Sequence, residues 1–248
     1  MVFPGGLWAV APLGHRYCST IALVILRDAP PTQALLIDTR SPGEYASGHL
    51  PGALNVDLSS FRARLRSAEE LQGLQQSLAE LNGRIGASPG RLVVVYDSGL
   101  TTRLSKTAFM LALGGLEVHL WPQGWEPQAT EQAPSHPVPT APWGELNREI
   151  LLTADEVLGE SVLLDVREPH EFASGRIPGA QNVPLSHFRA DNAGELGLQS
   201  GQAVGLHCRS GARSALAFWL LREQGVRAKN YLGSMLEWEA EGDLPLER

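Results

Sequence analysis

Short apolar runs without polar alternation recur along this 248-residue chain, and segments of helical character lie between them. Three runs stand in each half: ALLID (34–38), RLVVVY (91–96) and EVHLW (117–121), then VLLDV (162–166), AVGLH (203–207) and AKNYL (228–232). A helical segment follows the middle run of each half, over Arg103 to Leu113 and over Arg213 to Gln224. Strands that are apolar on both faces and separated by helices are typical of a parallel sheet covered on both sides.

The two halves repeat one another. Asp38 to Ala53 reads DTRSPGEYASGHLPGA and Asp165 to Ala180 reads DVREPHEFASGRIPGA, with ten of sixteen positions identical at an offset of 127 residues. A short helical run is also expected ahead of each repeat, over Ser19 to Arg27 and over Thr153 to Leu158, where Glu156 completes a capping box. We therefore predict an α/β protein with two tandem domains, each a small parallel sheet flanked by helices.

A proline-rich segment separates the halves. Residues 126–143, EPQATEQAPSHPVPTAPW, contain five prolines and no apolar periodicity, which indicates an extended linker. The predicted boundaries are 1–130 for the N-terminal domain, 131–148 for the linker and 149–248 for the C-terminal domain.

Composition narrows the class of protein. Hydrophobic residues make up 43% of the chain and charged residues 19%, which suits globular domains with a core. The formal net charge of −7 argues against nucleic acid as a partner. No apolar run approaches the length of a membrane helix, and the N-terminus lacks the basic region of a signal peptide. We expect a cytoplasmic protein without a membrane partner.

Two cysteines, Cys18 and Cys208, are too few and too far apart for a zinc site, and such sparse use suits a reducing compartment. Cys208 begins the sequence CRSGARS, directly between a predicted central strand and a helix. Helix N-termini carry partial positive charge, Arg209 and Arg213 add two cations, and Gly211 can adopt a left-handed conformation. Such a setting lowers a thiol pKa and forms a nest for anions, so a reactive thiolate is favoured over a structural core cysteine.

The motif DVREPHEFASGRIPGA, the loop CRSGAR and the ending LGSMLEWEAEGDLP resemble the rhodanese (thiosulfate sulfurtransferase) superfamily, and the likeness extends to both halves. The resemblance implies that Cys208 carries sulfane sulfur as a persulfide. It also implies that Asp165 and Arg167 form a structural pair inside the domain. The substrate-binding loop implied by the resemblance comprises Arg209, Ser210, Gly211, Ala212 and Arg213.

The first half departs from this motif where chemistry would occur. Asp97 stands in place of the cysteine, and a carboxylate cannot form a persulfide, so the N-terminal domain is expected to be catalytically inactive. Two interpretations of Asp97 are open, a helix N-cap or a wall of the active site of the other domain. A second departure is Glu171, since thiosulfate-type tandem enzymes usually have a basic residue there.

The leading hypothesis is a sulfurtransferase that moves sulfur from a small anionic donor such as thiosulfate to a thiol, cyanide or protein acceptor, without metal or cofactor. One alternative is a cysteine-based phosphatase or arsenate reductase, although the Cys208 to Arg213 loop is one residue shorter than Cys-x5-Arg. Another is a non-catalytic sulfur carrier or regulatory module. Cys18 is interpreted as an inert thiol, and His207 as a hydrogen-bonded core histidine rather than a general base.

Overall fold

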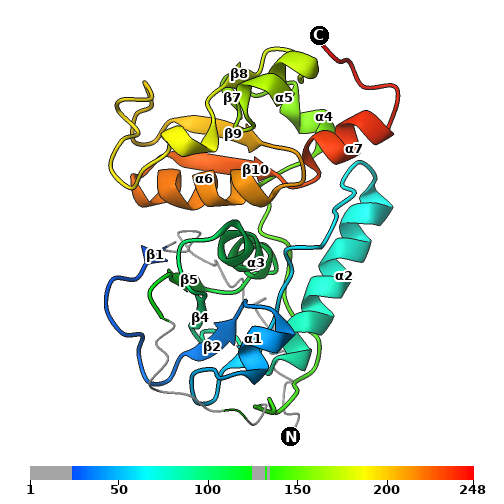
Figure 1. The fold of residues 1–248 in the computed structure, drawn as a ribbon. Coiled ribbons are helices and arrows are strands. Elements are labelled where there is room, and N and C mark those ends of the chain that lie inside the picture. Colours follow the sequence, from blue (N-terminus) through cyan, green and yellow to red (C-terminus); the bar gives the residue numbers. More distant parts are fainter. Residues whose placement is uncertain (1–23, 125–131, 133–134) are drawn as a thin grey trace, which may run out of the picture.

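Two five-stranded sheets, one from each half of the chain, form the framework of the protein (Figure 1). The computed structural model describes residues 24–124, 132 and 135–248. Every pairing within both sheets is parallel, as the apolar runs predict. The predicted α/β architecture with two parallel sheets flanked by helices is confirmed. In the described part of the chain, no helix is long and apolar enough to span a membrane.

The elements of the two halves follow one plan. The first half contains β1 (Val24–Ile25), β2 (Leu35–Asp38), α1 (Pro42–Ala46), β3 (Leu54–Asn55), α2 (Ala68–Arg84), β4 (Val93–Tyr96), α3 (Thr102–Leu113) and β5 (Val118–Trp121). The second half contains β6 (Leu151–Leu152), α4 (Ala154–Val157), β7 (Leu163–Asp165), α5 (Pro169–Ser174), β8 (Gln181–Asn182), the 3-10 helix η1 (Leu185–His187), β9 (Ala203–His207), α6 (Ala212–Glu223), β10 (Arg227–Tyr231) and α7 (Ser234–Ala240).

Strand order is equivalent in the two sheets, β1-β5-β4-β2-β3 in the first and β6-β10-β9-β7-β8 in the second. The predicted helical run over 19–27 is wrong where the structure describes it. Val24 and Ile25 instead form the edge strand β1 and pair with His119 and Leu120 of β5. Val24 and Ile25 are both β-branched, and such side chains fit a pleated surface better than a helix.

The described part of the proline-rich segment is extended and lies along the end of α2. Thr140 N–H donates to the carbonyl of Gly83 at 2.9 Å, and Trp143 Nε1 donates to the carbonyl of Ala87 at 2.8 Å. Asn82 Nδ2 donates in turn to the carbonyl of Trp143 at 3.0 Å. This segment is therefore held on the first half by hydrogen bonds, rather than crossing solvent as a free linker.

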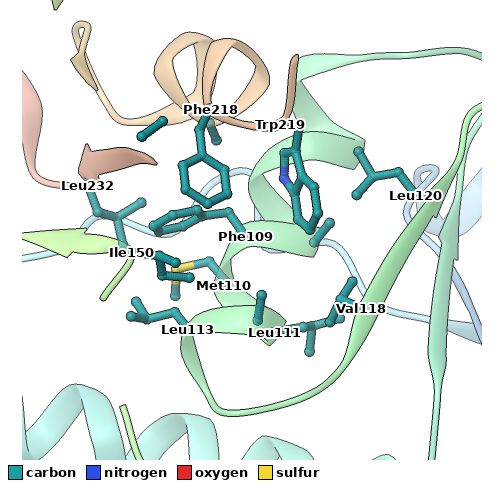
Figure 2. Close-up of a cluster of buried hydrophobic side chains, with 14 of the residues drawn as sticks. Phe109, Met110, Leu111, Leu113, Val118, Leu120, Ile150, Phe218, Trp219 and Leu232 are labelled. Carbon is teal, nitrogen blue, oxygen red and sulfur yellow. The ribbon is translucent and has the colours of Figure 1, made fainter. Parts of the chain in front are cut away.

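The halves meet through α3 and α6, which pack against each other (Figures 1 and 2). Phe109 and Phe218 contact edge to face, with ring centroids 5.0 Å apart, and Trp219 Nε1 donates to the carbonyl of Ser105 at 3.0 Å. Residues 104–113 of α3 are all buried, because the first sheet covers one side of the helix and α6 the other. One hydrophobic cluster consequently runs through both halves.

Each half also contains the same buried ion pair. Arg40 Nη2 lies 2.6 Å from Asp38 Oδ2, and Arg167 Nη2 lies 2.6 Å from Asp165 Oδ2. Arg167 also donates at 2.7 Å to the carbonyl of Gly175, as Arg40 does to an equivalent carbonyl in its own half. Both pairs tie the end of a strand to the helical turn that follows it.

Candidate active site

Cys208 follows β9 immediately, at the carboxyl end of the central strand, and only three residues separate it from the first residue of α6. The residue is 1% exposed. Gly211 adopts φ 79°, as the sequence predicts, and a Cβ there would lie 2.4 Å from the carbonyl oxygen of Leu232. A glycine is therefore required for the loop to turn into the helix at this point.

The thiol of Cys208 has a lowered pKa although the residue is buried. Burial is the largest single influence and raises the pKa, but hydrogen bonds from the hydroxyl and N–H of Ser214 and from the N–H of Ser210 outweigh it. The charge of Arg213 acts in the same direction. The Ser214 hydroxyl lies 3.5 Å from the sulfur. The surroundings thus favour the thiolate over the neutral thiol.

The backbone of the loop is held from outside by the start of α7. Met235 N–H donates to the carbonyl of Cys208 at 3.2 Å, and Leu236 N–H donates to the carbonyl of Arg209 at 2.9 Å. Ser234 accepts from Cys208 N–H at 3.1 Å through its hydroxyl and has φ 54°, an uncommon conformation for a residue with a side chain. Because carbonyl and N–H of a trans peptide point in opposite directions, these bonds fix the directions of the loop N–H groups.

The two loop arginines differ in their surroundings. Arg213 forms a two-pronged ion pair with Glu171, at 2.6 and 2.9 Å, and this hydrogen bonding lowers the pKa of Glu171 to about 2. Arg209 is exposed, and its guanidinium has no hydrogen bond or ion pair within the described residues. The sequence predicts two loop cations that could attract an anion. In the structure, Glu171 neutralises Arg213, and Arg209 is the loop cation that stays available to an anion.

His207 lies next to the thiol in sequence but does not act on it. Its ring is fully buried, with Nε2 3.8 Å from Asp165 Oδ2, and burial lowers its pKa to about 4. A neutral imidazole of that pKa is a weak general base near neutral pH. The Asp165 carboxylate and the backbone of Cys208 oppose this lowering of the pKa without forming a hydrogen bond of good geometry within the described part, so His207 is a core histidine but not the well hydrogen-bonded one expected. Cys18 lies outside the described residues.

Asp97 occupies the position after β4 that Cys208 occupies after β9. The N-cap interpretation is wrong, because α3 is capped by Thr101, whose hydroxyl accepts from Leu104 N–H. Burial opposes ionisation of Asp97, but hydrogen bonds from Arg103, Ser98 and other neighbours lower its pKa to about 2. Arg103 is the second residue of α3 and pairs with this carboxylate at 2.9 Å, so an internal anion fills the site.

Two residues that bind Cys208 were missed by sequence reasoning, Ser214 at its sulfur and Ser234 at its backbone N–H. Ser214 directly follows the loop, and its place in the first turn of the helix behind a candidate nucleophile is a signal that could have identified it. Ser234 is 26 residues from Cys208, within the C-terminal motif, and no spacing in the sequence links it to the loop.

Replacing Ser214 with alanine is expected to raise the pKa of the Cys208 thiol, because the thiolate loses its hydroxyl donor. The rate of alkylation of Cys208 by iodoacetamide, followed against pH, measures this change. Ser210→Ala is the matched control, since its contribution comes from backbone N–H and the variant keeps that donor. Equal pKa values in the wild type and Ser214→Ala would exclude a role of the hydroxyl.

Comparison with known proteins gives a consistent result. A sequence profile described as "Rhodanese-like domain" matches residues 24–128 and 151–241. The thiosulfate sulfurtransferase of Azotobacter vinelandii is 29% identical over 247 residues, covering 87% of this chain and 91% of the relative. The 3-mercaptopyruvate sulfurtransferase of Escherichia coli K12 is 25% identical and covers 89% and 93%. A crystal structure of a "Probable Thiosulfate Sulfurtransferase" is 50% identical, with a TM-score of 0.84 and coverage of 89% and 100%.

Proposed function

The chain belongs to the rhodanese family and is a sulfurtransferase, and we propose that it carries sulfane sulfur as a persulfide on Cys208. The observation that supports this most directly is geometric: Cys208 lies between the end of β9 and the start of α6, and the Ser214 hydroxyl lies 3.5 Å from its sulfur. Ser210, Gly211, Ala212 and Arg213 supply the surrounding loop, and Arg209 the exposed cation. The donor we propose is thiosulfate, the substrate in the names of several relatives.

The reaction we propose has two steps. The Cys208 thiolate attacks the outer sulfur of thiosulfate, a new S–S bond forms, the S–S bond of thiosulfate breaks, and sulfite leaves with the bonding electrons. The persulfide anion remains on the enzyme. A thiophilic acceptor such as cyanide or a thiolate then attacks the outer sulfur, and the Cys208 thiolate is released as the leaving group. Charge is conserved in both steps, and no oxidant or reductant is consumed.

The phosphatase alternative is disfavoured by the size of the loop. Four residues separate Cys208 from Arg213, and Cys208 is 1% exposed, so one terminal sulfur atom suits the site better than a tetrahedral phosphate. A non-catalytic carrier does not account for an activated thiol at this position.

In the same proposal the first half of the chain is catalytically inactive, because its site holds Asp97 and the paired Arg103. The domain division we propose places the boundary between residues 130 and 149. We also propose a cytoplasmic location, since a reducing environment would keep a single catalytic thiol from being oxidised to a disulfide.

Intact mass spectrometry tests the proposed function. After incubation with thiosulfate the protein should gain the mass of one sulfur atom, and cyanide should remove it with formation of thiocyanate. Parallel incubations with 3-mercaptopyruvate and with a persulfide-loaded cysteine desulfurase identify the preferred donor. Hydrolysis of aryl phosphates that requires Cys208, without any gain of sulfur, would instead assign the protein to the phosphatase class.

Charge near the loop should control the affinity for an anionic donor. Arg209→Ala is expected to raise the KM for thiosulfate by about 3–10-fold with little change in kcat. The reason is that Arg209 would attract the dianion equally in the ground state and in the transition state. Glu171→Gln should lower this KM, since it frees the guanidinium of Arg213. The control is Arg176→Ala, which removes a cation paired with Glu247 in the same half. An unchanged KM in Arg209→Ala would show that the backbone alone binds the donor.

A further inference from the structure

Lysine is rare in this chain. Lys106 and Lys229 are the only lysines among the 20 Lys and Arg residues. Lys229 lies on β10 and pairs with Glu160 at 3.6 Å. Lys106 lies on α3, in the half that does not contain Cys208, and is fully buried. A chain that uses arginine almost everywhere else therefore has a compact ammonium group at one buried position of the contact between the halves.

The ammonium of Lys106 donates to three carbonyls. Nζ lies 2.6 Å from the oxygen of Phe61, 2.9 Å from that of Ser210 and 3.4 Å from that of Ser59. Phe61 and Ser59 belong to the first half, whereas Ser210 is in the loop that carries Cys208. Three donors meet three acceptors, an arrangement that the planar guanidinium of an arginine would not reproduce.

Burying this charge has a cost that packing alone does not explain. No carboxylate lies within 4.0 Å of the Lys106 ammonium in the described residues. Burial and, to a smaller extent, the charge of Arg62 lower the pKa of Lys106 to about 8, against the opposing influence of Cys208 and Asp57. A methionine would fill a similar volume without desolvating an ammonium. Cys208 is thus one of two anionic groups that favour the charged lysine.

Lys106 also completes the set of bonds that hold the loop. The carbonyls of residues 208 and 209 accept from the start of α7, and that of Gly211 accepts from Asn230 Nδ2 at 3.4 Å. The carbonyl of Ser210 is the one in this series held from the other half. Fixing that carbonyl directs the N–H of Gly211 to the opposite side of the peptide, away from Lys106.

We propose that Lys106 is a positioning residue, through which the first half orients the Ser210–Gly211 peptide and stabilises negative charge on the sulfur of Cys208. The part of this inference that concerns the persulfide rests on the proposed function. The part that concerns the thiolate does not. In this arrangement the first half contributes to the active site through α3, although its own Asp97 cannot carry sulfur.

The coupling between the two groups can be measured without altering Lys106. Protein labelled with ¹³C- and ¹⁵N-lysine should give two side-chain signals, and the Lys229→Met variant assigns them. Above the pKa of the thiol, Lys106 should titrate at higher pH in the wild type than in Cys208→Ser, because the thiolate stabilises the ammonium. Identical titration of Lys106 in both proteins would overturn the proposal.

The reciprocal experiment uses Lys106→Met, which keeps the length of the side chain and removes its charge and donors. Its thiolate fraction at neutral pH, from alkylation of Cys208 against pH, should fall by about 3–10-fold, and Lys106→Arg should recover part of this loss. Lys229→Met should match the wild type. A merely structural lysine would change the melting temperature but leave the pKa of the thiol in place.

The two proposals fail differently. If the wild type gains no sulfur from any donor while the Lys106 and Cys208 titrations remain coupled, the proposed function is wrong and the positioning role stands. If sulfur is gained and the titrations are independent, the sulfurtransfer mechanism stands and Lys106 has no part in it.

Discussion

Cys208→Ser is expected to abolish sulfur transfer from thiosulfate to cyanide, lowering kcat/KM by at least about 10³-fold. A serine hydroxyl is not ionised near neutral pH and cannot form a persulfide, so neither step of the reaction can begin. The substitution preserves shape, and the bond from Cys208 N–H to Ser234 is unaffected because it involves the backbone. The loss should therefore appear in activity with little change in stability.

Cys18→Ser is the control for this experiment, since Cys18 is the other thiol of the chain and is expected to be inert. Steady-state thiocyanate formation measures both variants, and intact mass records whether sulfur is loaded. Retention of wild-type turnover in Cys208→Ser would disprove the mechanism. If turnover were lost in Cys18→Ser and kept in Cys208→Ser, the nucleophile would be Cys18, which lies outside the described part of the chain.

Arg167→Met should destabilise the fold by about 3–5 kcal/mol, because it leaves the carboxylate of Asp165 buried without its cation. Asp165 is fully buried, and Arg167 also holds the carbonyl of Gly175, so two sets of hydrogen bonds are lost. Denaturation by urea gives the free energy of unfolding. The comparison is Arg148→Met, which breaks an exposed pair with Glu156 and should cost at most about 1 kcal/mol.

The repeat provides a second comparison for the same prediction. Arg40 binds Asp38 with the same 2.6 Å contact in the half without Cys208, so Arg40→Met should cause a similar loss of stability. Arg167→Met with unchanged stability and lost activity would instead assign Arg167 to catalysis. That outcome would contradict the structural role inferred from the sequence.

Much of the fold can be predicted from the sequence, because the apolar runs and the repeated motif that indicate it are local features of the chain. The strands β4 and β9 are continuous apolar runs, and the duplicated motif predicts that both halves share one topology. The helix α2 was not predicted, although Ser67 and Glu70 form a capping box at its start. It has no counterpart of this length in the second half, so an argument from the repeat could not reveal it.

The contacts that shape the site join residues that are distant in sequence. Glu171 is 42 residues from Arg213, and Lys106 is 104 residues from Ser210. Pairings of this kind depend on which helices pack together and on which carbonyls their side chains reach, and neither periodicity nor motif spacing encodes that. Sequence reasoning therefore predicts a nucleophile and its loop, but not the groups that neutralise or orient them.

The contact between α3 and α6 gives the first half a structural role that does not depend on the aspartate in its loop. Phe218 and Trp219 are 0% and 1% exposed because α3 covers them. A truncation that removed the first half would uncover this aromatic face and create a surface prone to self-association. The first copy therefore shields the aromatic face of the second, whatever residue its own loop carries.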